Sequence, residues 1–319
     1  MKPRARLLWG WPEVLDEVPG LREELGKFSD VVVFTPGEKF APAGEFDIIV
    51  PPLSQDFDQA AISSVSGLKI IGTPTTGSDH IAVAFAESVG IQVITVKNER
   101  ALLDNVQSTA ELAWMLILAC QRNLRAALGQ VADGEWNGSA VRGHELIGKT
   151  LGIVGHGRLG SMMSRFAQAF RMRVLATDPL PIADPSVKQV PFDTLLGEAD
   201  IVTVHVHLSE TTHLMFNASA FQKMKPGAVF VNTSRGGLVD EDALIEVLRS
   251  GKLAAAGLDV ISHEREPDRL SRPLLRYAAT HPNLIITPHV GGFTLEAQAK
   301  VQTHLVKLVK QAWLDRQIS

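Results

Sequence analysis

The sequence predicts an α/β protein built from two doubly wound parallel-sheet domains. Apolar, β-branched runs alternate with helical patterns from the N-terminus onward, which is typical of parallel strands joined by crossover helices. A glycine-rich run at residues 151–160 lies near the middle of the 319-residue chain. A chain of this length is long enough for two domains, so we expect one domain before that run and another around it.

The first domain is expected to have five strands and few long helices. Helical patterns lie near residues 12–27, 55–65 and 79–88, whereas residues 35–46 are rich in Pro and Gly and predict a loop. The predicted strands are residues 6–9, 30–34, 47–50, 68–72 and 91–96.

The second domain is expected to have six strands, which would fit two mononucleotide-binding halves. These predicted strands are residues 152–155, 173–177, 201–205, 228–232, 254–258 and 284–287. One helix should begin at Asp240 with an acidic first turn and end at Gly251. Helices at 108–122 and 294–314 would connect the domains, the second returning to the first domain. We therefore predict one domain from residues 1–103 and 291–319, and another from residues 104–290.

The glycines at 155, 157 and 160 form a G-x-G-x-x-G motif between a predicted strand and a helix at 161–170. Gly155 would permit a tight turn, Gly157 would let a pyrophosphate approach the backbone, and Gly160 would let the helix pack closely. The N-terminus of the helix would attract the phosphates. Asp178 ends the next strand and would accept hydrogen bonds from ribose hydroxyls. No Arg or Lys follows it directly, so NAD is predicted rather than NADP. A glycine-rich turn without a ligand is the alternative.

Composition excludes several other classes of protein. The formal net charge of −4 argues against nucleic-acid binding. The single cysteine, Cys120, lies in an apolar helical run, so we expect a buried thiol, no intrachain disulfide and a reducing cytoplasm. The longest apolar run, residues 112–120, is too short to span a membrane, and we identify no signal peptide.

Several further motifs follow one another along the chain. They are Gly134-Glu-Trp, Gly143-His-Glu-Leu-Ile-Gly-Lys-Thr-Leu-Gly, Glu198-Ala-Asp, Met224-Lys-Pro-Gly-Ala, Asn232-Thr-Ser-Arg-Gly-Gly-Leu-Val-Asp, Gly257-Leu-Asp-Val and Thr287-Pro-His-Val-Gly-Gly. With the glycine motif, they make the chain resemble the D-isomer-specific 2-hydroxyacid dehydrogenases over nearly its whole length. The resemblance is strongest over residues 134–294 and weaker before Ile71.

The resemblance implies a Rossmann NAD-binding domain and a smaller flavodoxin-like substrate domain formed by both chain ends. It also implies NAD as cofactor, a small D-2-hydroxy or 2-keto acid as substrate, and a homodimer formed through residues 107–145. A metal, a nucleic-acid partner and a membrane are not expected.

The resemblance also assigns roles to individual residues. It makes Arg235 the substrate-binding arginine, Glu264 the acid that supports catalysis and His289 the catalytic histidine. The implied substrate contacts are Thr75, Thr76, Gly77, Arg235 and His289. The implied cofactor contacts are Gly155, Gly157, Arg158, Leu159, Gly160, Asp178, Val206, His207, Thr212, Thr233, Ser234, Arg235, Asp259, His289 and Gly292.

Chemistry explains why an arginine, a histidine and an acid would serve this reaction. A guanidinium can donate two hydrogen bonds to a 2-oxo carboxylate and keeps its charge. A histidine titrates near neutrality, so it can take the hydroxyl proton and return it to the ketone. A carboxylate behind the histidine would fix its tautomer and favour the imidazolium.

Other interpretations of these residues remain open. Arg235 could be a solvated loop arginine, and His289 a histidine of the core. Glu264 could be one surface charge among several, in which case Glu266 is the alternative acid. His205, His207 and His213 lie close together in sequence, but their spacing and the single nearby acid, Glu210, make a metal site a weak hypothesis.

The chain departs from the family pattern at several positions. His207 and Arg265 stand where proline is usual, and Ile261 where phenylalanine is usual. In the substrate loop, Thr75 stands where glycine is usual and Ala82 where an acid is usual. The loop could therefore be shaped for an uncommon acid.

Three functions are compatible with the sequence. The leading hypothesis is an NAD-dependent dehydrogenase acting on a glyoxylate- or hydroxypyruvate-type acid. A second is a dehydrogenase of a phosphorylated acid of the phosphoglycerate or 4-phosphoerythronate type, which would need extra cations near residues 51–80, where only Lys69 and His80 occur. The third is a non-catalytic, NAD-sensing protein similar to a transcriptional corepressor.

Overall fold

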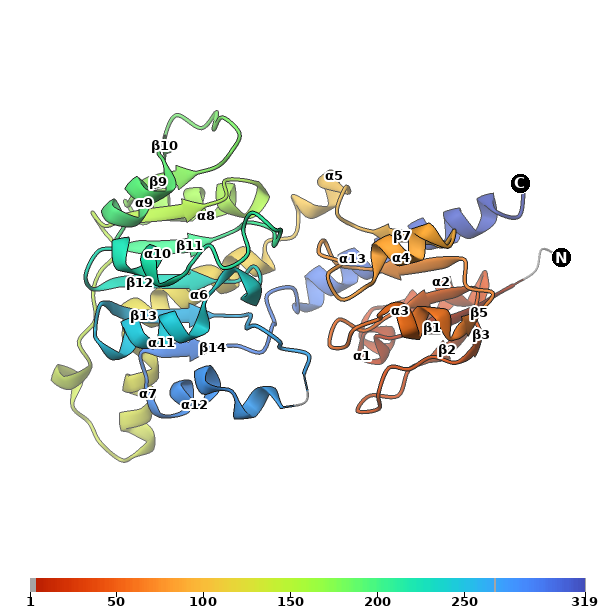
Figure 1. Cartoon of the computed structure of the whole chain (residues 1–319), viewed down its shortest axis with the longest axis horizontal. Coiled ribbons are helices and arrows are strands. Elements are labelled where there is room, and N and C mark those ends of the chain that lie inside the picture. The colour runs from red at the N-terminus through yellow and green to blue at the C-terminus, as the bar shows by residue number, and fades with distance from the viewer. Residues whose placement is uncertain (1–3, 267, 319) are drawn as a thin grey trace. The chain divides into compact units, whose positions relative to one another are not determined.

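The computed structural model describes residues 4–266 and 268–318 (Figure 1). The chain forms two compact units, Met1–Val106 with Phe293–Ser319 and Gln107–Gly292. The chain thus leaves the first unit, builds the second and returns to the first. Both crossing points lie slightly further along the chain than the sequence analysis placed them.

The first unit contains a five-stranded parallel sheet with the order β2-β1-β4-β6-β7. Its strands are β1 (Ala5–Trp9), β2 (Ser29–Val33), β4 (Ile48–Val50), β6 (Ile70–Thr73) and β7 (Gln92–Thr95). Counted among themselves, these strands have the order 2-1-3-4-5, which confirms the flavodoxin-like prediction. The short strands β3 (Gly44–Glu45) and β5 (Val65–Ser66) pair separately, within and after the predicted loop.

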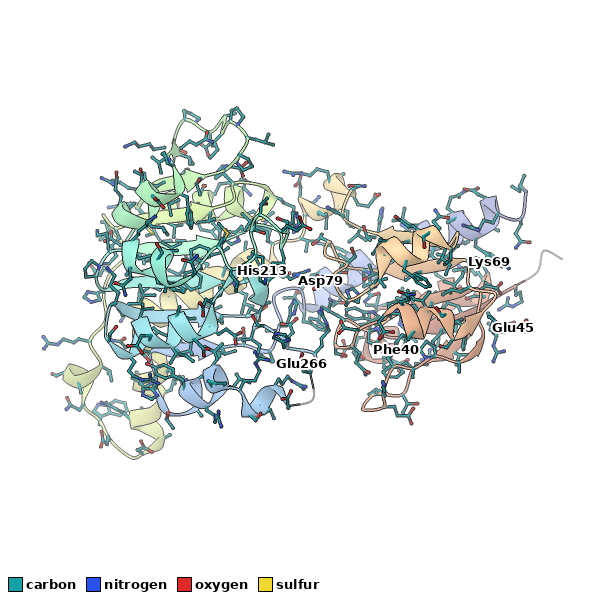
Figure 2. The ribbon with its side chains drawn as sticks, viewed as in Figure 1. Phe40, Glu45, Lys69, Asp79, His213 and Glu266 are labelled. Carbon is teal, nitrogen blue, oxygen red and sulfur yellow. The ribbon has the colours of Figure 1, made fainter. Side chains whose placement is uncertain are left out.

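Alternating side chains supply a core on each face of this sheet, as the period of a strand requires. Leu7 and Ile48 belong to one core, and Leu8 and Ile49 to the other. Phe40, labelled in Figure 2, makes edge contacts with other aromatic rings in the second core. The first core includes residues of α1 (Pro12–Glu17), α2 (Leu21–Gly26) and α13 (Leu295–Asp315), and the second includes residues of α3 (Gln59–Ser63) and α4 (Val83–Ser88). The short helix α5 (Arg100–Leu103) follows β7.

The predicted helix at 12–27 is wrong as a single element, because it is two helices. Val18 is extended, as a residue before proline usually is, and Pro19 cannot continue a helical hydrogen-bond pattern. Gly20 then caps α2 with a φ of 77°.

The second unit contains a seven-stranded parallel sheet with the order β10-β9-β8-β11-β12-β13-β14. Its strands are β8 (Thr150–Val154), β9 (Arg173–Thr177), β10 (Lys188–Gln189), β11 (Ile201–Val204), β12 (Ala228–Asn232), β13 (Leu253–Leu258) and β14 (Leu284–Ile286). The prediction of six strands is wrong, because it missed β10, which has two residues and no apolar run. The first six strands have the 3-2-1-4-5-6 order of a Rossmann fold, and β14 extends the sheet.

Helices cover both faces of this sheet (Figure 1). Val229 and Val231 of β12 join the core that includes α6 and α8, whereas Phe230 joins the core with α9 to α12. The helices of the unit are α6 (Ser108–Gln121), α7 (Leu124–Ala132), α8 (Arg158–Ala169), α9 (Phe192–Glu198), α10 (Ala218–Lys223), α11 (Glu241–Arg249) and α12 (Pro273–Thr280). Short 3₁₀ turns occur at Gly138–Val141, Gly236–Leu238 and Arg269–Ser271. Within the part of the chain that is described, no helix has the length and apolarity needed to cross a membrane.

The capping pattern places the ends of two further helices. Asp240 caps α11 by accepting a hydrogen bond from the backbone N–H of Ala243, and Gly251 follows the helix with a φ of 74°. Thr294 caps α13 in the same way and begins the return of the chain to the first unit.

Candidate active site

The predicted cofactor and catalytic residues of the second unit lie in the loops that follow β8, β9, β11, β12, β13 and β14, or in the first turn of α8. These strands are parallel, so their carboxyl ends share one edge of the sheet. Ligands of doubly wound sheets bind at this edge.

The three motif glycines have different steric surroundings. Gly155 has a φ of 90°, and a Cβ atom there would lie 2.7 Å from the carbonyl oxygen of His205. A Cβ atom at Gly160 would lie 2.1 Å from the carbonyl oxygen of Gly155. At Gly157, by contrast, a Cβ atom would meet no described atom within 4 Å. Packing therefore requires the first and third glycines, while the second leaves open space beside the N-terminus of α8.

The carboxylate of Asp178, at the end of β9, is bound to the glycine loop. One oxygen accepts the backbone N–H of His156 at 2.7 Å, and the other accepts that of Leu180 at 2.9 Å. A carboxylate has about four lone-pair positions, so capacity remains for a ribose diol. The open backbone at Gly157 and this fixed acid fit the predicted NAD site.

The loop after β11 is braced by its own polar groups. The Thr212 hydroxyl donates to the carbonyl oxygen of His207 at 2.7 Å and accepts the N–H of Ser209 at 2.8 Å. Val206 contacts the glycine loop, since its Cγ1 would lie 2.7 Å from a Cβ atom at Gly155. His207 is exposed on this loop.

The loop after β12 is held by the buried side chain of Asn232. Its Nδ2 donates to the carbonyl oxygen of Arg235 at 2.9 Å, and its Oδ1 accepts the N–H of Ser234 at 2.9 Å. The Ser234 hydroxyl donates to the carbonyl oxygen of Val204 at 2.7 Å. The hydroxyl oxygen of Thr233 is buried with no hydrogen-bond partner among the described residues. A bound group could satisfy that hydroxyl, which again fits a cofactor at this edge.

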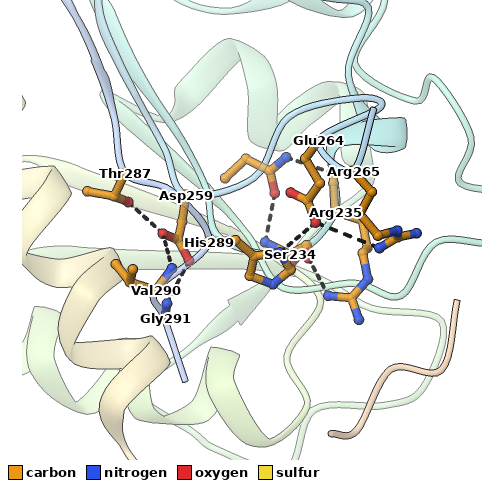
Figure 3. Close-up of polar contacts among 10 residues, drawn as sticks. Ser234, Arg235, Asp259, Glu264, Arg265, Thr287, His289, Val290 and Gly291 are labelled. Atoms are coloured by element: carbon orange, nitrogen blue, oxygen red, sulfur yellow. Dashed lines mark hydrogen bonds and ion pairs between the residues drawn. The ribbon is translucent and has the colours of Figure 1, made fainter. Parts of the chain in front are cut away.

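His289 and Glu264 form a close pair in the loops after β14 and β13 (Figure 3). His289 Nδ1 lies 2.6 Å from Glu264 Oε1, and the two side chains are 24% and 20% exposed. A carboxylate only accepts hydrogen bonds, so Nδ1 carries the proton and Nε2 is left to face a ligand. Glu266, the alternative acid, instead lies 2.7 Å from Nδ1 of His263 in a half-exposed pair. The acid beside His289 is thus Glu264.

Asp259 holds the turn that carries His289. One of its carboxylate oxygens accepts the N–H of Val290 at 2.9 Å and the hydroxyl of Thr287 at 2.5 Å, and the other accepts the N–H of Gly291 at 2.8 Å. Burial raises the pKa of Asp259, while these hydrogen bonds act in the opposite direction. His289 itself has a φ of 55°, an uncommon conformation that its surroundings must maintain. These contacts make Asp259 a support for the histidine, in addition to its expected place beside the cofactor.

The loop that carries Arg235 packs directly on the segment that leads to Glu264. A Cβ atom at Gly236 would lie 2.0 Å from the carbonyl carbon of Ile261, so only glycine fits there. The Arg235 guanidinium donates to the carbonyl oxygen of Ser234 at 2.7 Å (Figure 3). Because β12, β13 and β14 are neighbours, the arginine, the acid and the histidine come to one end of three adjacent strands.

The predicted substrate loop lies in the first unit, after β6. The Thr75 hydroxyl donates to the carbonyl oxygen of Gly77 at 2.6 Å and lies 2.7 Å from the hydroxyl oxygen of Thr73. Thr76 is partly exposed in the same loop. Neither Thr73 nor its hydroxyl contact is predicted from the sequence.

The remaining predicted cofactor residues stand at element ends. Arg158 and Leu159 begin α8, and Gly292 ends the second unit.

Asn232 was also missed as a site residue. A polar residue that ends a buried strand directly before a glycine-rich turn is the signal that could have found it.

Comparison with known proteins identifies the family. A family model described as D-isomer specific 2-hydroxyacid dehydrogenase, NAD binding domain, matches residues 114–291. The chain belongs to this family. It is 40% identical over 266 residues to a hydroxypyruvate reductase of Thermotoga maritima, covering 83% of this chain and 84% of the relative. The second unit is therefore an NAD-binding domain, and the chain is an NAD-dependent D-2-hydroxyacid dehydrogenase.

Two other relatives extend the comparison. A D-3-phosphoglycerate dehydrogenase of Archaeoglobus fulgidus is 39% identical over 261 residues, which are 81% of this chain but 47% of that protein. The chain thus spans about half the length of that relative. Among solved structures, D-lactate dehydrogenase from Aquifex aeolicus in complex with NAD and lactic acid matches with a TM-score of 0.84 and 26% identity. That match covers 98% of this chain and 96% of the other.

Proposed function

We propose that this dehydrogenase interconverts a small, unphosphorylated 2-keto acid and its D-2-hydroxy acid, with a glyoxylate- or hydroxypyruvate-type substrate. The observation that carries the proposal is the 2.6 Å contact between His289 Nδ1 and Glu264 Oε1, which leaves Nε2 to exchange a proton with substrate. The similarity to a hydroxypyruvate reductase supports the substrate class.

The cofactor would bind along the carboxyl edge of the second sheet. Gly155, Gly157 and Gly160 would hold the pyrophosphate at the start of α8, and Asp178 would hold the ribose. Thr233, with its buried hydroxyl, would lie toward the nicotinamide end. When bound, NAD supplies or accepts the hydride at C2 of the substrate.

The chain's own residues would then bind the acid and move one proton. The Arg235 guanidinium would bind the substrate carboxylate and orient the carbonyl group. His289 Nε2 would give its proton to the carbonyl oxygen during reduction and take it back during oxidation. Glu264 would hold Nδ1–H and stabilise the imidazolium. General acid–base catalysis of this kind contributes about 10²–10⁴-fold to rate.

We propose that the first unit is the substrate domain. Its Thr75–Gly77 backbone would hold the substrate carboxylate, and Asp259 and Gly292 would stand at the cofactor side in the second unit. These assignments follow from the family resemblance together with the braced geometry of the loop at Thr75.

The two basic residues within positions 51–80 favour an unphosphorylated substrate. Lys69, labelled in Figure 2, lies 2.7 Å from an Asp47 oxygen and 5.2 Å from the ring centroid of Trp313. His80 is 1% exposed. Both candidate phosphate-binding cations are thus engaged or buried.

A homodimer is part of the proposal. No residue of α7 is buried in the described structure, and its apolar side chains Leu128 and Val131 are 63% and 59% exposed. Nearby Trp136 is 92% exposed. We propose that a second copy covers this surface, and sedimentation of the purified chain would test it.

The buried thiol of Cys120 suits a reducing cytoplasm, which we propose as the location.

Steady-state assays with NADH and a panel of 2-keto acids test the function. We expect turnover of glyoxylate or hydroxypyruvate with a kcat/KM well above that of phosphorylated acids. A preference for 3-phosphohydroxypyruvate would contradict the substrate class. Tight NADH binding without turnover on any acid would support the NAD-sensing alternative instead.

A further inference from the structure

A second guanidinium lies beside the Glu264–His289 pair. Arg265 Nη1 is 3.9 Å from Glu264 Oε1, the same oxygen that lies 2.6 Å from His289 Nδ1 (Figure 3). The side chain of Arg265 is 19% exposed and that of Glu264 is 20% exposed. The two charges are therefore mostly withdrawn from water, where screening is weaker than at an open surface.

The effect of this arginine on a proton at His289 has a definite sign. A guanidinium keeps its positive charge at every accessible pH. It attracts the Glu264 carboxylate and favours its ionised form, but it repels a second positive charge on the adjoining imidazole. The shared oxygen couples the two effects, because the positive field of Arg265 offsets part of the negative field with which the carboxylate stabilises an imidazolium.

We propose that Arg265 is a positioning residue that acts through Glu264 and lowers the pH range over which His289 holds its second proton. This inference rests on the proposed role of His289 as the proton donor in reduction. Arg265 would thereby set the pH range in which the site works. The enzyme would be a weaker reductase at alkaline pH than a variant with a neutral residue at position 265.

Other charged groups around the pair must be held constant in any test. Asp259 interacts electrostatically with His289 from the end of β13, and Arg235 lies in the loop after β12. Glu241 accepts the N–H of Ser262 at 2.6 Å. The outer charges of this loop include Asp268, Arg269 and the His263–Glu266 pair, together with Arg272, which lies 3.9 Å from Glu241 and 3.5 Å from Glu266. A substitution confined to Arg265 leaves all of these in place.

Three variants separate charge from shape. Arg265→Gln removes the charge and keeps much of the length, whereas Arg265→Lys keeps the charge. Arg269→Gln is the matched control, because Arg269 is an exposed arginine of the same loop whose guanidinium donates to the carbonyl oxygen of Glu266 at 3.1 Å. None of the three removes a residue that we place in contact with substrate.

Two measurements test the effect of Arg265 on the proton at His289. The first is the pH dependence of kcat/KM for keto-acid reduction, and the second is an NMR titration of the imidazole of His289, with its signal assigned by its loss in His289→Asn. For Arg265→Gln we expect both the upper pH limit of reduction and the imidazole midpoint to rise by about one pH unit. Arg265→Lys should shift much less, and Arg269→Gln should match the wild type.

The outcomes are separable. A midpoint in Arg265→Gln that equals the wild type overturns the inference, even if activity falls, because lost activity without a pH shift indicates a purely structural role. An equal shift in Arg269→Gln also overturns it. If the wild type reduces no 2-keto acid, the proposed function fails, and the titration alone still decides whether Arg265 controls the proton at His289.

Discussion

Replacing Glu264 with Gln tests the catalytic pair without changing its shape. The amide oxygen of Gln can still accept the Nδ1–H of His289 across the 2.6 Å contact, so the tautomer is kept and only the negative charge is lost. Hydrogen bonds to charged groups contribute about 1.5–3 kcal/mol, and a loss of about 2 kcal/mol in the transition state lowers rate about thirty-fold. We therefore expect kcat/KM for keto-acid reduction to fall by about that factor.

The pH profile and a matched control complete this test. Without the carboxylate the imidazolium is less favoured, so the upper pH limit of reduction should move to lower pH. Glu266→Gln is the control, because Glu266 pairs at 2.7 Å with the half-exposed His263 and not with His289. We expect that variant to reduce keto acids at the wild-type rate. Equal losses in both variants, or an unmoved profile in Glu264→Gln, would refute the reasoning.

Three other predictions follow from named contacts. Arg235→Lys should raise KM for keto acids at least ten-fold in steady-state assays, because a lysine cannot replace the two-pronged guanidinium, and an unchanged KM would remove Arg235 from the substrate site. Thr75→Val should raise KM with little change in kcat, since it removes the 2.6 Å hydrogen bond to Gly77, whereas Thr75→Ser should restore the wild-type KM. Burial lowers the pKa of His205 from 6.5 to about 3. As pH falls, His205 is therefore protonated in the unfolded chain before it is protonated in the folded one. Denaturant titrations should show about 2 kcal/mol of stability lost from this group between pH ~7 and pH ~5. His205→Gln should flatten that dependence, and an equally steep loss in the variant would exclude His205 as its source.

The strongly apolar strands could be predicted from the sequence because their composition reflects burial on both faces. In β12, for example, Val229 and Phe230 face different cores, so the whole strand is apolar and easily located. The strand β10 could not be found in this way. It has two residues, both exposed, and it owes its strand conformation to pairing with β9 and not to its own sequence.

In the site, too, residues required by local packing could be predicted from the sequence, whereas contacts between distant segments could not. The glycine motif could be recognised because Gly155 and Gly160 are required by close packing, against the loop after the neighbouring strand β11 and against Gly155 itself. The choice between Glu264 and Glu266 could not be made from spacing, because it depends on which carboxylate reaches His289, in the loop after another strand.

A crystal structure with NADH and an unreactive analogue of a 2-keto acid tests the central claim most directly. We predict that Nε2 of His289 lies about 3 Å from the oxygen at C2, while its Nδ1 keeps the Glu264 contact. The Arg235 guanidinium should bind the carboxylate of the analogue, with the nicotinamide ring facing C2. An analogue bound away from these side chains, or a nicotinamide directed elsewhere, would contradict the account.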